Sequence, residues 1–97
     1  MTLSQTYTLD RDAELTDRVR ELIATTFVID PEEVTDDLSQ ASCSRWTSLY
    51  HMMLMVVLEE QFELSLSVDE MTSMTSLGEI VRVVKLHQST DGVDYPV

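Results

Sequence analysis

The segment RWTSLYHMMLMVVLEEQF, residues 45–62, decides the fold. A polar stretch gives way here to an apolar run that continues as far as Glu59 and Glu60. Thr47 and Ser48 stand at the change, and either hydroxyl can cap the start of a helix. The spacing predicts a helix that ends near Phe62, with a turn containing His51 leading to an inward stripe of Leu54, Met55, Leu58 and Phe62.

Helical spacing also predicts three further helices, one before this segment and two after it. Upstream, a helix should run from a cap at Asp10 or Asp12 to Thr26 or Phe27, and a single turn should follow at Pro31. Downstream, residues 68–73 predict a brief helix. Ser76 and Glu79 form a capping-box pattern that opens a last helix, which should continue to about His87.

The domain organisation follows from these elements. Residues 11–87 are predicted to form one folded domain, flanked by flexible tails at 1–10 and 88–97. No segment alternates apolar and polar residues long enough to predict a strand. We therefore expect an all-α fold, a four-helix bundle of three longer helices and one short third helix.

Composition excludes several classes of function. The 97 residues include 18 acidic and 6 basic side chains, a net charge of -12 that repels nucleic acid and favours basic protein partners. No apolar window is long enough to predict membrane insertion, and no export signal precedes the domain. One cysteine, Cys43, fits a reducing compartment. We expect a cytoplasmic monomer.

The residues around Ser48 resemble the acyl carrier protein family, whose centre is an Asp-Ser-Leu sequence that opens a helix ending in acidic residues and Phe. The corresponding residues here are Thr47-Ser48-Leu49 and Leu58-Glu59-Glu60-Gln61-Phe62. The likeness continues over roughly residues 15–86, through Glu32-Glu33-Val34-Thr35 and Met74-Thr75-Ser76-Leu77-Gly78-Glu79. Trp46 and His51 complete a Trp-x-Ser-Leu-x-His variant, which is similar to stand-alone carriers of specialised metabolism.

This resemblance implies that Ser48 carries 4'-phosphopantetheine, transferred from coenzyme A by a phosphopantetheinyl transferase. A loading ligase would then attach acyl or aminoacyl groups to the arm as thioesters, and downstream acyl-transfer or synthase enzymes would receive them. Three features depart from the family. Thr47 replaces the usual Asp, the Asp-Leu-Gly approach is missing, and Gln40 replaces a core aromatic for which Leu38 or Trp46 can substitute. The structural alternative is that Ser48 only caps the helix.

Two surfaces of the second predicted helix have separate expected roles. We predict a partner-docking surface with an acidic rim, made of Leu49, Tyr50, Met52, Met53, Val56, Glu59 and Glu60, with Glu63 beyond it. The resemblance implies a cargo pocket lined by Leu54, Val57, Leu66, Met71, Met74 and Leu77. The competing interpretation of these six residues is a fully packed core, which would suit polar or aminoacyl cargo.

Other functions are weaker interpretations of the same residues. Ser48 and His51 are three apart on one predicted helix and could form a nucleophile with its base, but the sequence offers no orienting carboxylate at a fixed spacing and no glycine-rich oxyanion turn. We therefore predict a non-catalytic protein. No metal site is predicted, because His51 and His87 lie far apart in the sequence. An acidic, unmodified helical interaction module remains the main alternative.

Overall fold

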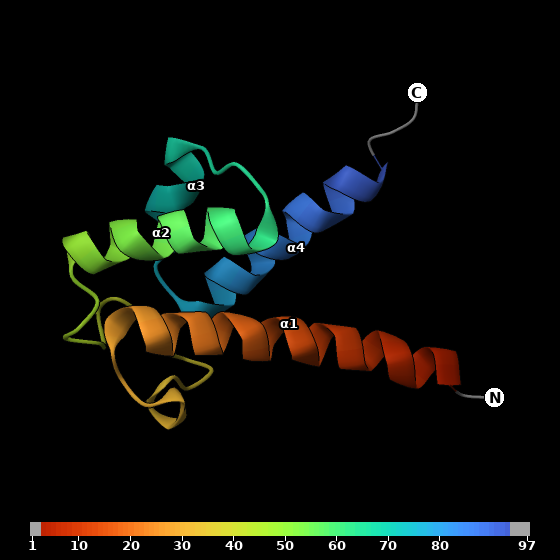
Figure 1. Cartoon of the computed structure of the whole chain (residues 1–97), viewed down its shortest axis with the longest axis horizontal. Helices are drawn as coiled ribbons and strands as arrows, with labels where there is room; N and C mark the ends of the chain where they lie inside the picture. The colour runs from red at the N-terminus through yellow and green to blue at the C-terminus, as the bar shows by residue number, and fades with distance from the viewer. Residues whose placement is uncertain (1–2, 94–97) are drawn as a thin grey trace.

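The computed structural model describes the backbone of residues 3–93 and the side chains of residues 13–88. Within that part of the chain the order is α1 (Leu3–Phe27), the 3-10 helix η1 (Pro31–Glu33), α2 (Ser48–Phe62), α3 (Val68–Ser73) and α4 (Leu77–Val93). Figure 1 shows α1 and α2 lying along one another, with α4 crossing behind α2 and α3 above it. The predicted all-α bundle of three longer helices and one short one is confirmed.

The outer ends of α1 and α4 correct two predicted boundaries. α1 begins at Leu3 instead of at a cap on Asp10 or Asp12, and α4 continues to Val93 instead of ending near His87. Residues 3–27 contain neither Pro nor Gly, and Ser and Thr carry only a modest helix penalty, so nothing in the sequence stops the helix at residue 10. The remainder of each predicted tail, residues 1–2 and 94–97, lies outside the described residues.

α1 ends as predicted at Phe27, in a left-handed turn. The Ile29 N–H donates to the Ala24 carbonyl at 3.0 Å and the Val28 N–H donates to Thr25, which is the Schellman pattern. Val28 occupies the position that glycine usually takes, with a φ of 59°. A β-branched residue in this region is strained by about 1–2 kcal/mol. Pro31 then opens η1 and turns the chain away from α1.

One hydrophobic core joins α1, α2 and α4. From α1 it takes Val19, Ile23 and Phe27, and from α4 Ile80, Val83 and Val84, all of them buried. The predicted inward stripe of α2 is confirmed for Leu54, Met55 and Leu58, while Phe62 is partly buried and lies under the Arg18 guanidinium, 5.1 Å from its ring centroid. These three helices thus share one apolar interior, against which Met71 of α3 packs in part.

The long polar loop between η1 and α2 is hydrogen-bonded to the segment that leads into α4. Gln40 donates its N–H to the Thr75 carbonyl at 2.8 Å, and Leu77 donates to the Leu38 carbonyl at 3.0 Å. Leu38 and Trp46 are both buried, so either can substitute for the core aromatic that Gln40 replaces. These contacts hold the loop against the start of α4. They therefore help to position the end of the loop, where Ser48 begins α2.

Candidate functional site

Ser48 is the first residue of α2, and Thr47 caps the helix in its place. The Thr47 hydroxyl accepts the Tyr50 N–H at 3.2 Å, and its carbonyl accepts the His51 N–H at 2.8 Å. The sequence left Thr47 and Ser48 as equal candidates for the cap. Because Thr47 performs it, the alternative that Ser48 serves only as the cap is wrong.

The Ser48 side chain is exposed and available for reaction. Among residues 13–88 the Ser48 hydroxyl has no hydrogen-bond partner. The N–H groups of Ser48 and Leu49 precede the helical ladder, and such groups favour a negatively charged substituent. The first turn of α2 contains no acidic residue that would repel it.

A hydrogen-bonded chain beneath Ser48 joins the loop, α2 and α3. The buried Trp46 donates its indole N–H to His51 Nδ1 at 2.9 Å. Because indole can only donate, Nδ1 must accept, and the proton of neutral His51 is therefore on Nε2. Nε2 donates to the Met71 carbonyl at 2.8 Å. The sequence placed Trp46 and His51 together in one motif but did not predict this chain.

This arrangement leaves His51 unsuited to act as a base for Ser48. Both of its ring nitrogens are used, one by Trp46 and one by the Met71 carbonyl. The Trp46 and His51 rings also stack, with centroids 6.1 Å apart. Ser48 therefore presents an exposed hydroxyl, while the His51 imidazole has a structural role.

The second histidine holds the same short helix from the other side. His87 on α4 donates from Nε2 to the Glu70 carboxylate at 3.0 Å, and the Ser67 N–H donates to Glu70 at 2.9 Å. The Ser67 N–H, and then His87, lower the pKa of Glu70 below its ordinary value of 4.5. None of the six residues of α3 is buried, and only Met71 packs partly against the core, so these polar contacts add to its attachment.

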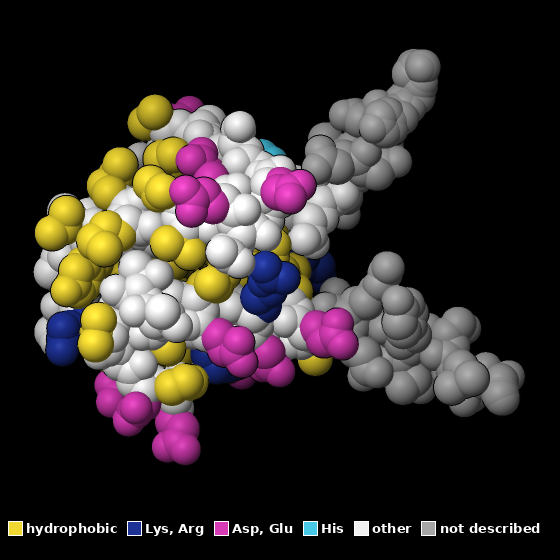
Figure 2. Space-filling model, viewed as in Figure 1, with side chains coloured by type: hydrophobic (Ala, Val, Ile, Leu, Met, Phe, Trp, Pro, Cys, Tyr) yellow, Lys and Arg dark blue, Asp and Glu magenta, His cyan; other side chains and the backbone are white. Residues whose placement is uncertain are grey.

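The outward face of α2 carries an apolar stripe, which consists of Leu49, Met52, Met53 and Val56. Their exposed fractions are 67%, 53%, 44% and 50%. Figure 2 shows hydrophobic side chains gathered over α2, with acidic side chains nearer its C-terminal end. Because these residues are three or four apart, they form one continuous strip beginning beside Ser48.

Two residues assigned to the docking surface have inward contacts instead. Tyr50 is half-buried and stacks on Phe27, with ring centroids 5.9 Å apart. Glu59 is also half-buried, and its carboxylate accepts the Leu66 N–H at 2.9 Å, which ties the end of α2 to the following linker. Glu60 and Glu63 are exposed and can form the predicted acidic rim.

Five of the six residues expected around a cargo pocket belong to the core or pack against it, and Val57 is not among them. Leu54, Leu66, Met74 and Leu77 are buried, and Val57 and Met71 are partly buried. None of the six lines either of two surface hollows that lie among the described side chains. The packing matches the alternative of a filled core.

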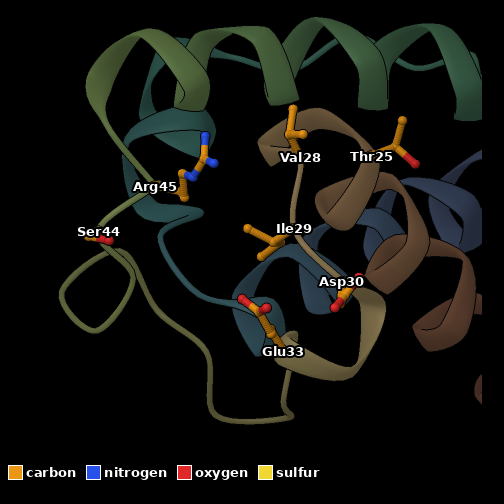
Figure 3. A pocket seen from close by; sticks show the side chains of 7 residues that line it. All are labelled: Thr25, Val28, Ile29, Asp30, Glu33, Ser44 and Arg45. Carbon is orange, nitrogen blue, oxygen red and sulfur yellow. The ribbon is translucent and has the colours of Figure 1, made fainter.

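One of these hollows, which we call the Arg45 cleft, lies just before the start of α2. It has a volume of about 610 Å³ and lies between the end of α1, η1 and the loop segment Ser44–Arg45. In Figure 3, Arg45 and Val28 lie on its α2 side, while Asp30 and Glu33 lie on the opposite side. The second hollow, of about 510 Å³, lies between Arg20 and Asp36, which pair at 2.9 Å.

The Arg45 cleft was not predicted from the sequence. Its walls come from two segments some fifteen residues apart, which meet only because the loop folds back along the bundle. The one local signal in the sequence is Val28, a β-branched residue at a helix end where glycine is usual, three residues before Pro31.

Comparisons with known proteins add no relative. No protein-family model matches the chain, and no curated protein matches it. None of the helices within residues 3–93 is both long enough and apolar enough to cross a membrane. The geometry around Ser48 and the resemblance in its motif are therefore the observations that bear on function.

Proposed function

We propose that the protein is a stand-alone acyl carrier that bears 4'-phosphopantetheine on Ser48. It rests on the start of α2, where Thr47 caps the helix and the exposed Ser48 hydroxyl has no hydrogen-bond partner among residues 13–88. The Trp-x-Ser-Leu-x-His motif and the four-helix order support it. The chain itself is non-catalytic in this proposal.

The chemistry at Ser48 would be supplied by an external transferase. Its hydroxyl would attack the β-phosphate of coenzyme A, forming a phosphodiester and releasing adenosine 3',5'-bisphosphate, with the hydroxyl proton passing to a base of the transferase. The free N–H groups of the first turn would then face the phosphodiester charge. The thiol of the arm would carry acyl or aminoacyl groups, loaded by a ligase and passed to acyl-transfer or synthase enzymes.

Partner enzymes are proposed to bind the apolar stripe. It begins one residue after Ser48, so a protein seated on it is close to the arm. Exposed apolar area drives binding, while Glu60 and Glu63 would orient a partner with basic groups at that end. In this proposal the protein is a monomer that acts in the cytoplasm.

The test is intact-mass measurement after incubation with coenzyme A and a broad-specificity transferase. The wild-type chain should gain one phosphopantetheine, and Ser48→Ala should gain none. An unmodified interaction module is the second candidate, and the exposed stripe favours it equally. No added mass with several transferases would support that module and contradict the carrier.

A further inference from the structure

The Arg45 cleft has walls of opposite charge with no internal partners. Asp30 and Glu33 bring two carboxylates and Arg45 brings a guanidinium. Among residues 13–88 none of the three forms an ion pair. Asp30 precedes η1 as its cap residue, yet its side chain makes no capping hydrogen bond. These charged groups are therefore free to meet a ligand.

The cleft lies within reach of an arm on Ser48. Arg45 precedes Ser48 by three residues, so their Cα atoms are separated by no more than about 11 Å. An arm on Ser48 begins with a negative phosphodiester and ends with its cargo. Arg45 lies on the α2 side of the cleft, and the two carboxylates lie on the far wall. An arm with a phosphodiester at its Ser48 end and a positive group at its other end would therefore meet a charge of opposite sign at each wall.

The interior of the bundle points to the same kind of cargo. The residues expected around an apolar pocket are packed, with Leu54 and Met74 fully buried. The Arg45 cleft, with a volume of about 610 Å³, is in the size range of small-molecule sites.

We propose that the Arg45 cleft receives the ammonium group of an aminoacyl cargo, with Asp30 and Glu33 as its partners. This inference rests on the proposed function and specifies its substrate class. Arg45 faces the phosphate end of the arm and repels a cationic cargo from that end. An uncharged acyl group gains nothing from the carboxylates and stays in solvent.

The experiment loads Ser48 with two matched arms in which nitrogen replaces the thiol sulfur, so that neither hydrolyses. One arm ends in a glycyl group and the other in an acetyl group, which differ by one ammonium. Backbone amide chemical shifts are recorded for both forms of the wild type and of Asp30→Asn with Glu33→Gln. Glu32→Gln is the control, because Glu32 is exposed and lines the other hollow.

The glycyl form should shift the amides of residues 28–33 and of Arg45, with a preference for the cleft of roughly two- to five-fold over the acetyl form, as expected for exposed ion pairs. The double variant should remove the difference, and Glu32→Gln should keep it. Equal shifts for both arms, no shifts, or shifts confined to core residues such as Leu54 would overturn the inference alone. Absence of added mass would remove the carrier function, and this inference with it.

Discussion

The two faces of α2 are similar in sequence and opposite in structure. Leu54, Met55 and Leu58 point inward and are fully buried, while the apolar stripe of Leu49, Met52, Met53 and Val56 is about half exposed. The inward face is explained by folding, because it fills the core shared with α1 and α4. The outward face adds nothing of that kind, so its apolar character requires another explanation, and binding is the one that we propose.

The largest expected difference between the two faces is in stability. Leu58→Ala should lower the free energy of unfolding by about 2–5 kcal/mol, since it removes a fully buried side chain and leaves a cavity. Leu49→Ala is the matched control on the outer face and should stay within about 0.5 kcal/mol. Urea unfolding followed by circular dichroism measures both. Similar losses for the two variants would show that the outer face also stabilises the fold.

A smaller loss is expected where α2 meets the loop. Trp46→Phe keeps an aromatic ring beside Phe27 but removes the donor to His51, and should cost about 1–3 kcal/mol. Tyr50→Phe is the control, since Tyr50 also stacks on Phe27 and its hydroxyl has no partner among the described side chains. If the two variants unfold at the same urea concentration, the Trp46–His51 hydrogen bond does not stabilise the site.

The anchoring of α3 should depend on pH. Because contacts with the Ser67 N–H and His87 lower the folded pKa of Glu70, its contribution is complete above the ordinary value of 4.5 and disappears as pH falls through the lower folded pKa. Glu70→Gln should therefore cost at most about 1 kcal/mol at neutral pH, given its partial exposure, and nothing in stronger acid. Unfolding curves at several pH values measure this.

Asp69→Asn provides the comparison for Glu70, because Asp69 is exposed in the same first turn of α3. Its effect at neutral pH should be smaller. A Glu70→Gln loss that persisted in strong acid would contradict the pKa argument.

The smallest effect on stability is expected from charges placed on the outer face. Met53→Glu and Val56→Glu should each change the free energy of unfolding by no more than about 0.5 kcal/mol. They should nevertheless slow acylation by the loading enzyme by about ten-fold or more, because they place charge within the docking strip. Val68→Glu adds the same charge at an exposed site on α3 and should leave acylation unchanged. An unchanged rate for all three variants would eliminate the docking surface.

Much of the fold could be predicted because apolar residues that recur at helical spacing become the buried face of a helix. The inward residues of α2, the end of α1 at Phe27 and the short α3 follow from apolar spacing and from Pro31. Helix ends without a breaker could not be predicted so well, and α1 accordingly extends back to Leu3. Local propensity alone does not decide how far such a helix continues.

The site was predictable only in part, for a different reason. The motif singles out Ser48 as the proposed attachment residue, but Thr47 and Ser48 are both good caps, and only the backbone geometry separates them. Glu59 was assigned to a surface rim, yet its carboxylate holds the Leu66 N–H. The Arg45 cleft joins segments that have no shared pattern in the sequence. Contacts of this kind depend on tertiary structure and leave no periodic signal.

We propose Ser48 as the attachment residue, and peptide mapping can show directly whether the arm is bound there. Trypsin should release residues 46–82 as one peptide, since no Lys or Arg lies between Arg45 and Arg82. After treatment with coenzyme A and transferase, fragmentation of this peptide should place one phosphopantetheine on Ser48 and leave Ser65, Ser67, Ser73 and Ser76 unmodified. An unmodified peptide, or an arm on any of those four serines, would show that Ser48 is not the attachment residue.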